Sequence, residues 1–485
     1  MSEKIEELRK VRIQKLGQLK KQGVDPYPVK TERTHAIAQA LELFDHGSRN
    51  TDHVTLVGRI RALREHGKLA FINLEDESGA IQLILKEDGL GADQYKNLSL
   101  LDIGDFLEAT GTLGLSNSGE KSLLTTNYKL LTKSIRPIPS DFFGLKDVET
   151  RLRKRYLDLL VNPETKELFR KKAVFWQTIR NFMIKQGFLE VWTPVLENIP
   201  GGADAEPFVT HHNKLDRDFY LRISLELPLK RLLVGGFEKV FEVGRLFRNE
   251  GIDREHLQEY DDMEFYWAYA DYQDGMKLVE KLFKKVVMAV IGSMETEYEG
   301  QKINWGGKWQ KLQYFTVFKK YTGLDLDKND EGDLRKKARE LGIGGIDKLG
   351  KGKLIDAIYK KVVRPKLIQP CFLVGHPIET TPLAKRDPKS SNKVLRFQPL
   401  AAGTELGNGF SELNDPLDQK ARFEQQMKLR EAGDKEAQMM DEDYVEALEY
   451  GMPPAVGFGV SERLFAVLMN KAMRETVIFP PMKEG

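Results

Sequence analysis

The stretch of the chain richest in potential chemistry, GRLFRNEGIDREHLQEYDDMEFYWAY (residues 244–269), places fixed charges between two apolar and aromatic runs. Side chains in a β-strand alternate between two faces, so each arm of this stretch puts its polar residues on one side. If the arms pair as a hairpin, one cleft receives Arg248, Tyr260, Glu264 and Tyr266. The loop between them adds Arg254 and His256. A cation, aromatic rings and a carboxylate on one surface indicate a ligand that is charged at both ends.

Two later stretches carry polar residues and glycines at strand-like spacing. TELGNGFSELNDP supplies Glu405, Asn408, Phe410 and Glu412. In GFGVSERLFAVLMN, two glycines would let the backbone approach a ligand, and Arg463 opens an apolar helix. Each set alone could be a surface ion pair, a turn or core packing. Together they indicate a ligand site, because charges on a central sheet are costly unless a ligand or a metal pairs with them.

Bulk composition predicts a soluble, cytoplasmic protein of two or three domains. The chain has 485 residues, of which 41% are hydrophobic and 31% charged, and its formal net charge is only +2. No apolar run is long enough to span a bilayer, and the charged N-terminus lacks a signal-peptide core. The single cysteine, Cys371, excludes an intramolecular disulfide and a cysteine-rich metal site and fits a reducing compartment. A polyanionic partner would have to bind at local patches.

The N-terminal part of the chain predicts a small barrel. Residues 1–50 are expected to form a helical region that packs on a domain formed by residues 51–135. Short alternating segments separated by Gly, Asp, Ser and Asn turns predict a five-stranded, all-β barrel of the oligonucleotide-binding type. Alternation turns Phe71 and Gln82 outward, near Arg64, where they could stack on and read unpaired bases. The alternative is that the N-terminal helix covers Phe71.

The rest of the chain predicts an α+β domain. Residues 136–160 are expected to form a linker with a basic helix. Residues 161–485 mix strands and helices without a regular βαβ rhythm, which favours an antiparallel or mixed sheet with helices. Asn162 and Pro163 begin a helix, and FLEVWTPVL then follows as a strand. A charged helical insertion is expected around 323–364. Its GIDKLGKG segment is a poor phosphate loop, because glycine replaces the Ser or Thr that would hold Mg²⁺.

Three motifs give the chain a resemblance to a known family. GFLEVWTPVL, FRNEG with EYDDMEFY, and GFGVSERL resemble the three motifs of the class II aminoacyl-tRNA synthetases. The strings IPGGADAEPFVTHHN, TTPLAKRDP, ELGNGFSELNDP and MRETVIFPPM resemble the members that activate lysine. The resemblance covers nearly the whole chain. It is specific, because related synthetases share the motifs but not these strings.

This resemblance implies a lysine–tRNA ligase activity. L-Lysine would react with ATP, in the presence of Mg²⁺, to give lysyl-adenylate and pyrophosphate, and the lysyl group would pass to the 3′ end of tRNA(Lys). The resemblance also implies an antiparallel-sheet catalytic domain, an N-terminal barrel that binds the tRNA anticodon, and a homodimer formed through the first motif. No membrane partner is expected.

The resemblance further implies roles for individual residues. The catalytic residues would be Arg248, Glu405 and Arg463, and ATP binding would add Glu250, Arg254, His256 and Tyr260 to them. The lysine site would comprise Gly202, Glu226, Arg248, Glu264, Tyr266, Asn408, Phe410, Glu412 and Gly459. The metal positions would be Glu405, Glu412 and Gln398, and the anticodon contacts Arg64, Phe71 and Gln82.

The sequence departs from the family pattern at several positions. Trp192 stands where the first motif usually has Glu, Tyr260 replaces Phe, Thr381 replaces Ser, and Gln398 replaces a Glu that normally helps to bind Mg²⁺. The third motif is also one residue shorter than is usual in the lysine-activating members. These differences leave open a related synthetase of different specificity, or a catalytically weakened paralogue that binds tRNA or a regulatory partner. A lysylating enzyme that acts on a protein is disfavoured, because such relatives lack the barrel. An internal Arg or Lys that neutralised the acidic end of the site would contradict the lysine interpretation.

Overall fold

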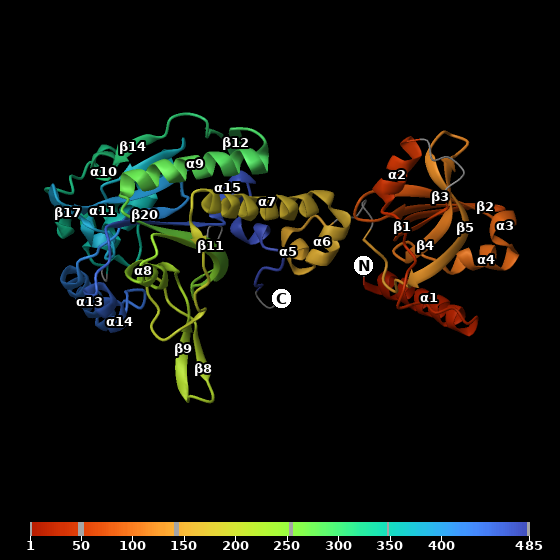
Figure 1. Ribbon diagram of the computed structural model, residues 1–485, viewed down its shortest axis with the longest axis horizontal. Helices are drawn as coiled ribbons and strands as arrows, with labels where there is room; N and C mark the ends of the chain where they lie inside the picture. Colours follow the sequence, from red (N-terminus) through yellow and green to blue (C-terminus); the bar gives the residue numbers. More distant parts are fainter. Residues whose placement is uncertain (1, 47–52, 140–144, 252–255, 347–348, 483–485) are drawn as a thin grey trace. The chain divides into compact units, whose positions relative to one another are not determined.

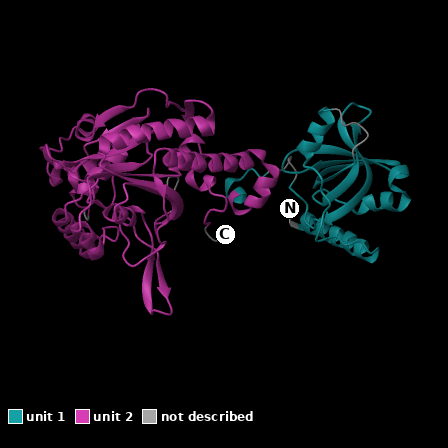
Figure 2. Cartoon of the chain, in the orientation of Figure 1, with its two compact units in different colours: residues 1–151 teal, residues 152–485 magenta. Residues whose placement is uncertain are grey.

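The computed structural model divides into two compact units, residues Met1–Arg151 and Leu152–Gly485 (Figure 2). It describes residues 2–46, 53–139, 145–251, 256–346 and 349–482. The division falls within the segment 136–160 that the sequence predicts to be a linker. Each unit has its own hydrophobic core.

The first unit is built on a closed five-stranded barrel, as its alternating pattern predicts (Figure 1). The strands follow the order β1-β2-β3-β5-β4 around the barrel. They are β1 (His53–His66), β2 (Leu69–Glu75), β3 (Ala80–Lys86), β4 (Phe106–Leu115) and β5 (Lys121–Thr132). Ala70, Ile72 and Leu74 are fully buried, because every second residue of β2 faces the interior.

Four α-helices accompany this barrel. They are α1 (Ser2–Lys21), α2 (Ile37–Asp45), α3 (Glu87–Leu90) and α4 (Ala92–Lys96). Helix α1 is anchored by Arg12, whose guanidinium donates at 3.0–3.1 Å to the backbone carbonyls of Ile103, Ser134 and Arg136. Lys15 adds an ion pair with Asp102 at 2.9 Å. These contacts hold α1 against the segments that flank β4 and β5.

The second unit is built on a nine-stranded sheet with the order β14-β15-β18-β20-β21-β11-β10-β6, to which β19 adds beside β18. Neighbouring strands run antiparallel except at the two ends, where β14–β15 and β10–β6 are parallel. The α+β class and the largely antiparallel sheet are therefore confirmed. The strands are β6 (Leu189–Glu190), β10 (Lys239–Phe247), β11 (Glu259–Ala268), β14 (Gln310–Gln313), β15 (Cys371–Val374), β18 (Arg396–Ala401), β19 (Thr404–Glu405), β20 (Asn408–Ser411) and β21 (Ala455–Ser461).

Helices cover both faces of this sheet. On one face lie α7 (Pro163–Lys185) and α9 (Tyr272–Ile291), and on the other lies α8 (Glu226–Val234). The β10–β11 hairpin contributes side chains to both faces. Phe241 and Phe265 belong to the core with α7 and α9, whereas Val240 and Tyr266 belong to the core with α8. The strand period of two thus separates a purely apolar face from a face that can carry a site.

The remaining helices flank this arrangement. Before α7 lie α5 (Val148–Arg153) and α6 (Arg155–Val161), and the C-terminal part supplies α13 (Pro416–Glu431), α14 (Glu442–Glu449) and α15 (Arg463–Leu468). The segment predicted to be a helical insertion contains α11 (Glu331–Glu340) and α12 (Lys351–Ile358), next to α10 (Tyr314–Thr322). These helices share a separate core that includes Leu334, Leu354 and Phe318.

The prediction of a single strand over FLEVWTPVL is wrong. The segment forms β6 and, after an irregular stretch, β7 (Leu196–Glu197), which belongs to a different sheet with β8 (Val209–His212) and β9 (Arg217–Leu221). Pro194 lacks the backbone N–H that a continuous ladder needs. Thr193 instead donates its N–H and its hydroxyl to Glu242, both at 2.8 Å. Two further small hairpins are β12 (Glu295–Tyr298) with β13 (Gln301–Asn304), and β16 (Arg386–Asp387) with β17 (Ser390–Val394).

Candidate active site

The charged hairpin forms as its alternation predicts. Strands β10 and β11 pair antiparallel, with Glu242 opposite Glu264 and Leu246 opposite Tyr260. The even-numbered positions therefore share the face on which α8 lies. Arg248 follows the end of β10, where its N–H donates to the carbonyl of Gln258 at 2.8 Å and continues the hairpin.

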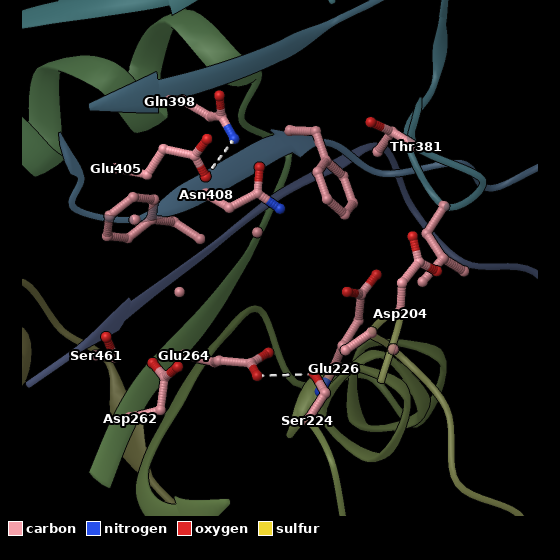
Figure 3. Close-up of a pocket in the computed structure, with 18 of the residues that line it drawn as sticks. Asp204, Ser224, Glu226, Asp262, Glu264, Thr381, Gln398, Glu405, Asn408 and Ser461 are labelled. Atoms are coloured by element: carbon pink, nitrogen blue, oxygen red, sulfur yellow. Dashed lines mark hydrogen bonds between the residues drawn. The ribbon is translucent and has the colours of Figure 1, made fainter. Parts of the chain in front are cut away.

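A cavity of about 300 Å³ opens on this face, between β11, β20 and β21 of the sheet and the start of α8. It is surrounded by carboxylates, amides and hydroxyls from these separate elements (Figure 3). Among its lining residues are fifteen that the sequence predicts for the site: Gly202, Glu226, Arg248, Glu250, His256, Tyr260, Glu264, Tyr266, Gln398, Glu405, Asn408, Phe410, Glu412, Gly459 and Arg463. Arg254 lies outside the described residues.

One end of the cavity is acidic, and Glu264 is held there by neutral donors. Its carboxylate accepts hydrogen bonds from the Ser224 hydroxyl and the Leu225 N–H, both at 2.8 Å, and from the Tyr266 hydroxyl at 2.9 Å. Figure 3 shows Glu264 pointing toward Ser224 beside Glu226. Burial raises the pKa of Glu264, and these hydrogen bonds oppose that rise because they favour the charged form.

An internal cation, Lys230, shares this acidic end and was not predicted. Its ammonium lies 2.5 Å from a carboxylate oxygen of Glu226 and also forms an ion pair with Glu412. Burial raises the pKa of Glu226 to about 7 and that of Glu412 well above its usual range, while Lys230 opposes both shifts. Lys230 pairs with two of the three carboxylates here, and Glu264 is hydrogen-bonded by neutral donors, so the acidic end is partly compensated and not neutralised.

The other end of the cavity is cationic and aromatic. The Arg248 guanidinium lies 5.5 Å from the centroid of the Tyr260 ring, and its Nε donates to the carbonyl of Ile223 at 3.4 Å. Arg463, the first residue of α15, donates to the backbone carbonyl of Glu405 at 3.4 Å. A guanidinium over an aromatic ring is a favourable arrangement that also suits a flat, electron-rich ligand group. His256 lines the cavity and is exposed.

Glu405 is a partly accessible carboxylate on the sheet side of the cavity. It is half-buried, and its Oε2 accepts a hydrogen bond from the Gln398 amide at 3.3 Å (Figure 3). The other side of that amide, Oε1, lies 2.9 Å from Nε2 of buried His376. Within the described residues no group of three or more His, Cys, Asp or Glu side chains could hold a metal ion.

Glycines make room for the buried carboxylates. A Cβ atom at Gly457 would lie 2.2 Å from a Glu412 oxygen and 2.4 Å from the Tyr266 ring. A Cβ atom at Gly459 would lie 3.3 Å from the Glu264 side chain. Gly202 has φ +89°, and a Cβ there would meet Ser224 and Glu226 at 2.8–2.9 Å. Gly457 and Gly459 were predicted to let the backbone approach a ligand, and Gly202 was predicted to contact lysine. Their closest neighbours are instead the side chains that form the acidic end.

Several lining residues were missed by the sequence analysis. Arg396 donates to the Asn408 side chain at 2.7 Å and to the Thr381 hydroxyl at 2.6 Å, so it positions a predicted site residue. Other polar lining residues that were not predicted for the site include Asp204, Ser224, Asp262 and Gln438. The spacing of Lys230, four residues after Glu226 on one helix face, is the signal that could have found the internal cation.

The barrel residues that are predicted to contact the anticodon share one outer surface. Arg64 on β1 lies directly opposite Phe71 on β2, and Gln82 on β3 lies opposite Asn73, two residues further along β2. Arg64 is exposed and Phe71 half-buried. The Gln82 amide donates to Glu120 at 2.9 Å.

No helix in the described part of the chain is both long and apolar enough to cross a membrane.

Comparison with known proteins agrees with this geometry. Residues 54–131 match the family described as OB-fold nucleic acid binding domain, and residues 147–483 match tRNA synthetases class II (D, K and N). A lysine–tRNA ligase of Carboxydothermus hydrogenoformans is 45% identical over 484 residues, which cover 99% of each chain. Lysine–tRNA ligases of a Roseiflexus species and of Bacillus subtilis are 45% and 41% identical, with at least 98% of each chain covered. The chain therefore belongs to the class II tRNA synthetases.

Proposed function

We propose that this chain is a lysine–tRNA ligase that activates L-lysine with ATP and transfers it to tRNA(Lys). The observation that carries the proposal is full-length similarity to lysine–tRNA ligases, combined with a cavity that is acidic at one end and cationic at the other. The predicted roles of individual residues fit this cavity as follows.

The activation step needs alignment more than proton transfer. The carboxylate of lysine is already ionised near neutral pH, so its oxygen can attack the α-phosphate of ATP without a general base. The α-phosphate–oxygen bond to the β-phosphate then breaks, and pyrophosphate leaves. Arg248 would bind the α-phosphate and the reacting carboxylate; its position in the cavity lining, over the Tyr260 ring, supports this role. In the second step a ribose hydroxyl of the tRNA 3′ end attacks the lysyl carbonyl, loses its proton, and displaces AMP.

ATP would bind at the cationic end. Arg463 and Tyr260 would lie on the two faces of adenine, and Glu250 and His256 would contact the rest of the nucleotide, because all four line this part of the cavity. Arg254, for which a phosphate contact is also expected, belongs to a segment outside the described residues.

Mg²⁺ would be held by Glu405, whose hard, half-buried carboxylate suits this ion. When bound, it would neutralise phosphate charge. The two other predicted metal positions fit less well: Glu412 faces Lys230, and Gln398 directs its amide N–H group at Glu405. Among the three predicted metal positions, Glu405 is therefore the one whose side chain best suits Mg²⁺.

Lysine would lie with its ε-ammonium at the acidic end. Glu264, Tyr266 and Glu412 would receive that group, and Phe410 would contact the methylene chain. The α-amino and carboxylate groups would be bound near Gly202, Glu226, Asn408 and Gly459. An aspartate or asparagine site would instead need a cation or an amide partner at this end. The three carboxylates beside one lysine favour a cationic substrate.

The barrel and the first motif suggest the macromolecular partners. The shared outer face of Arg64, Phe71 and Gln82 would contact the unpaired anticodon bases. A homodimer through the first motif is supported by apolar side chains that are exposed on α7 and just after it: Val174, Ile184, Leu189, Trp192 and Leu196. The cytoplasmic location stays a prediction.

Amino-acid-dependent exchange of pyrophosphate into ATP tests the function. With Mg²⁺ present, we expect exchange with lysine and not with aspartate or asparagine. Exchange with either of the latter would indicate a different specificity. No exchange with any amino acid would favour the alternative of a catalytically weakened paralogue.

A further inference from the structure

Lys230 is the charged residue of the cavity region with the deepest burial. Its side chain has no exposed surface, although it begins only one helical turn after Glu226 on α8. Its ammonium contacts Glu226 at 2.5 Å and Glu412, which follows β20, on the far side. It also lies 5.4 Å from the centre of the Phe410 ring and 6.0 Å from that of Tyr266.

This arrangement joins two carboxylates from separate elements, α8 and the segment that follows β20. Two buried carboxylates next to each other repel, and one of them would take up a proton or turn away if no cation lay between them. Lys230 removes that repulsion and fixes both carboxylates beside Phe410 and Tyr266. The acidic end is therefore assembled before any substrate enters.

The formal charges of this end leave room for two more cations. With every group counted as ionised, Glu226, Glu264 and Glu412 carry −3 together and Lys230 contributes +1; the nearby charges of Asp262 and Asp204 are offset by Arg248 and Arg396, so the sum is −2. An amino acid with one ammonium group would leave a buried carboxylate unpaired, which costs several kcal/mol. An amino acid with two ammonium groups would compensate the cluster completely.

We propose that Lys230 is a specificity-determining positioning residue, the resident cation that holds Glu226 and Glu412 in place and sets the charge of the pocket for an amino acid with two ammonium groups. This inference rests on the proposed lysine activation. It adds a residue that does not itself touch the reacting atoms.

The first test replaces Lys230 with methionine, which keeps the length of the side chain and removes its charge. In pyrophosphate exchange we expect Lys230→Met to raise the KM for lysine at least tenfold and to change the KM for ATP less than twofold. The preference for lysine over norleucine, which lacks the ε-ammonium, should fall by a similar factor. A KM for lysine within twofold of the unchanged chain would overturn the proposal.

Lys284→Met is the matched control. Lys284 forms an ion pair at the same spacing, with Glu280 four residues earlier on α9 at 2.7 Å, but this pair is partly exposed and neither residue lines the cavity. Its exchange kinetics should not change. If both variants impaired exchange equally, the effect would reflect the loss of a helix ion pair, and the proposed role of Lys230 would be wrong.

A double variant keeps the proposal testable if Lys230→Met alone folds poorly. Glu412→Gln leaves Lys230 facing one carboxylate fewer, so the formal sum becomes −1. Adding Lys230→Met returns it to −2. We therefore expect the double variant to have a lower KM for lysine than Glu412→Gln alone. An equal or higher KM would contradict the charge count.

The proposed function and this inference fail in different ways. If the unchanged chain shows no lysine-dependent exchange, the proposed function is wrong. If it shows exchange but the variants behave as the controls do, only the role of Lys230 is wrong.

Discussion

The outer face of the barrel and the cavity face of the catalytic sheet both carry polar residues at alternate strand positions, but in opposite surroundings. On the barrel, Arg64 is exposed and Phe71 is half-buried, outside a hydrophobic core. In the catalytic unit, Glu264 and Glu412 are buried on the face opposite the apolar core. The same alternation of side chains along a strand therefore produces a solvent-exposed surface, predicted to contact RNA bases, in one unit and a buried charged pocket in the other.

This difference should determine how strongly each region depends on a single side chain. Exposed groups are screened by water and salt, so the loss of one contact has a modest effect. Buried charges can be compensated only by each other or by a ligand, so the loss of one leaves another unpaired. The catalytic pocket should therefore be far more sensitive to a single substitution than the barrel face. Substitutions in the pocket should impair amino-acid activation, whereas those on the barrel should impair tRNA charging alone.

The largest effect is expected at Glu264. Glu264→Gln removes a buried charge that would pair with the ε-ammonium of lysine, a loss of about 3–5 kcal/mol. The KM for lysine in pyrophosphate exchange should rise about a hundredfold or more, and the KM for ATP should stay within about threefold. The exposed Glu295→Gln serves as control. Equal effects on the two KM values would contradict the assigned role.

A smaller and step-specific effect is expected at Phe71. Stacking of one base on an aromatic ring contributes about 1–3 kcal/mol, so Phe71→Ala should weaken tRNA charging about tenfold. Pyrophosphate exchange, which needs no tRNA, should be unchanged. Leu115→Ala, at an exposed end of β4, controls for loss of an apolar side chain from the barrel surface. A collapse of exchange in Phe71→Ala would mean that the contrast between the two units is wrong.

The smallest effect on the reaction is expected at Glu197, where a substitution should change stability and its pH dependence instead. Burial raises the pKa of Glu197 to about 8, and one of its oxygens has no hydrogen-bond partner. A raised carboxylate pKa means that the folded chain binds the proton more tightly than the unfolded chain does. The contribution of Glu197 to the free energy of unfolding is therefore greatest below the unfolded pKa near 4.3, and it is lost as the pH rises through 8. Glu197→Gln removes this titration. We expect the free energy of unfolding of Glu197→Gln, measured with denaturant and relative to that of the unchanged chain, to increase by about 1–3 kcal/mol from pH 5.5 to pH 8.5.

The exposed Glu446→Gln is the control for that measurement. It should show no gain over the same pH range. If Glu197→Gln also showed none, the buried carboxylates of the catalytic unit would not carry the cost that distinguishes them from the exposed charges of the barrel.

Much of the site could be predicted because strand alternation is local. The hairpin placed Glu264 and Tyr266 on one face, and the fifteen expected lining residues in the described part of the chain do meet in one cavity. The single strand predicted over FLEVWTPVL failed, because Pro194 interrupts the ladder and Glu242 binds the segment by its side chain. A side-chain partner distant in sequence is invisible to a local pattern.

The sequence by itself determined the closed barrel, the hairpin and the family, because alternation, turn residues and motif strings are properties of neighbouring residues. Only the tertiary structure decided which charges neutralise which. In the sequence Lys230 is one of many helical lysines, and only the packing of α8 on β10 and β11 brings its ammonium to Glu412. Electrostatic interactions depend on distance and burial, and both are fixed only when separate elements pack together.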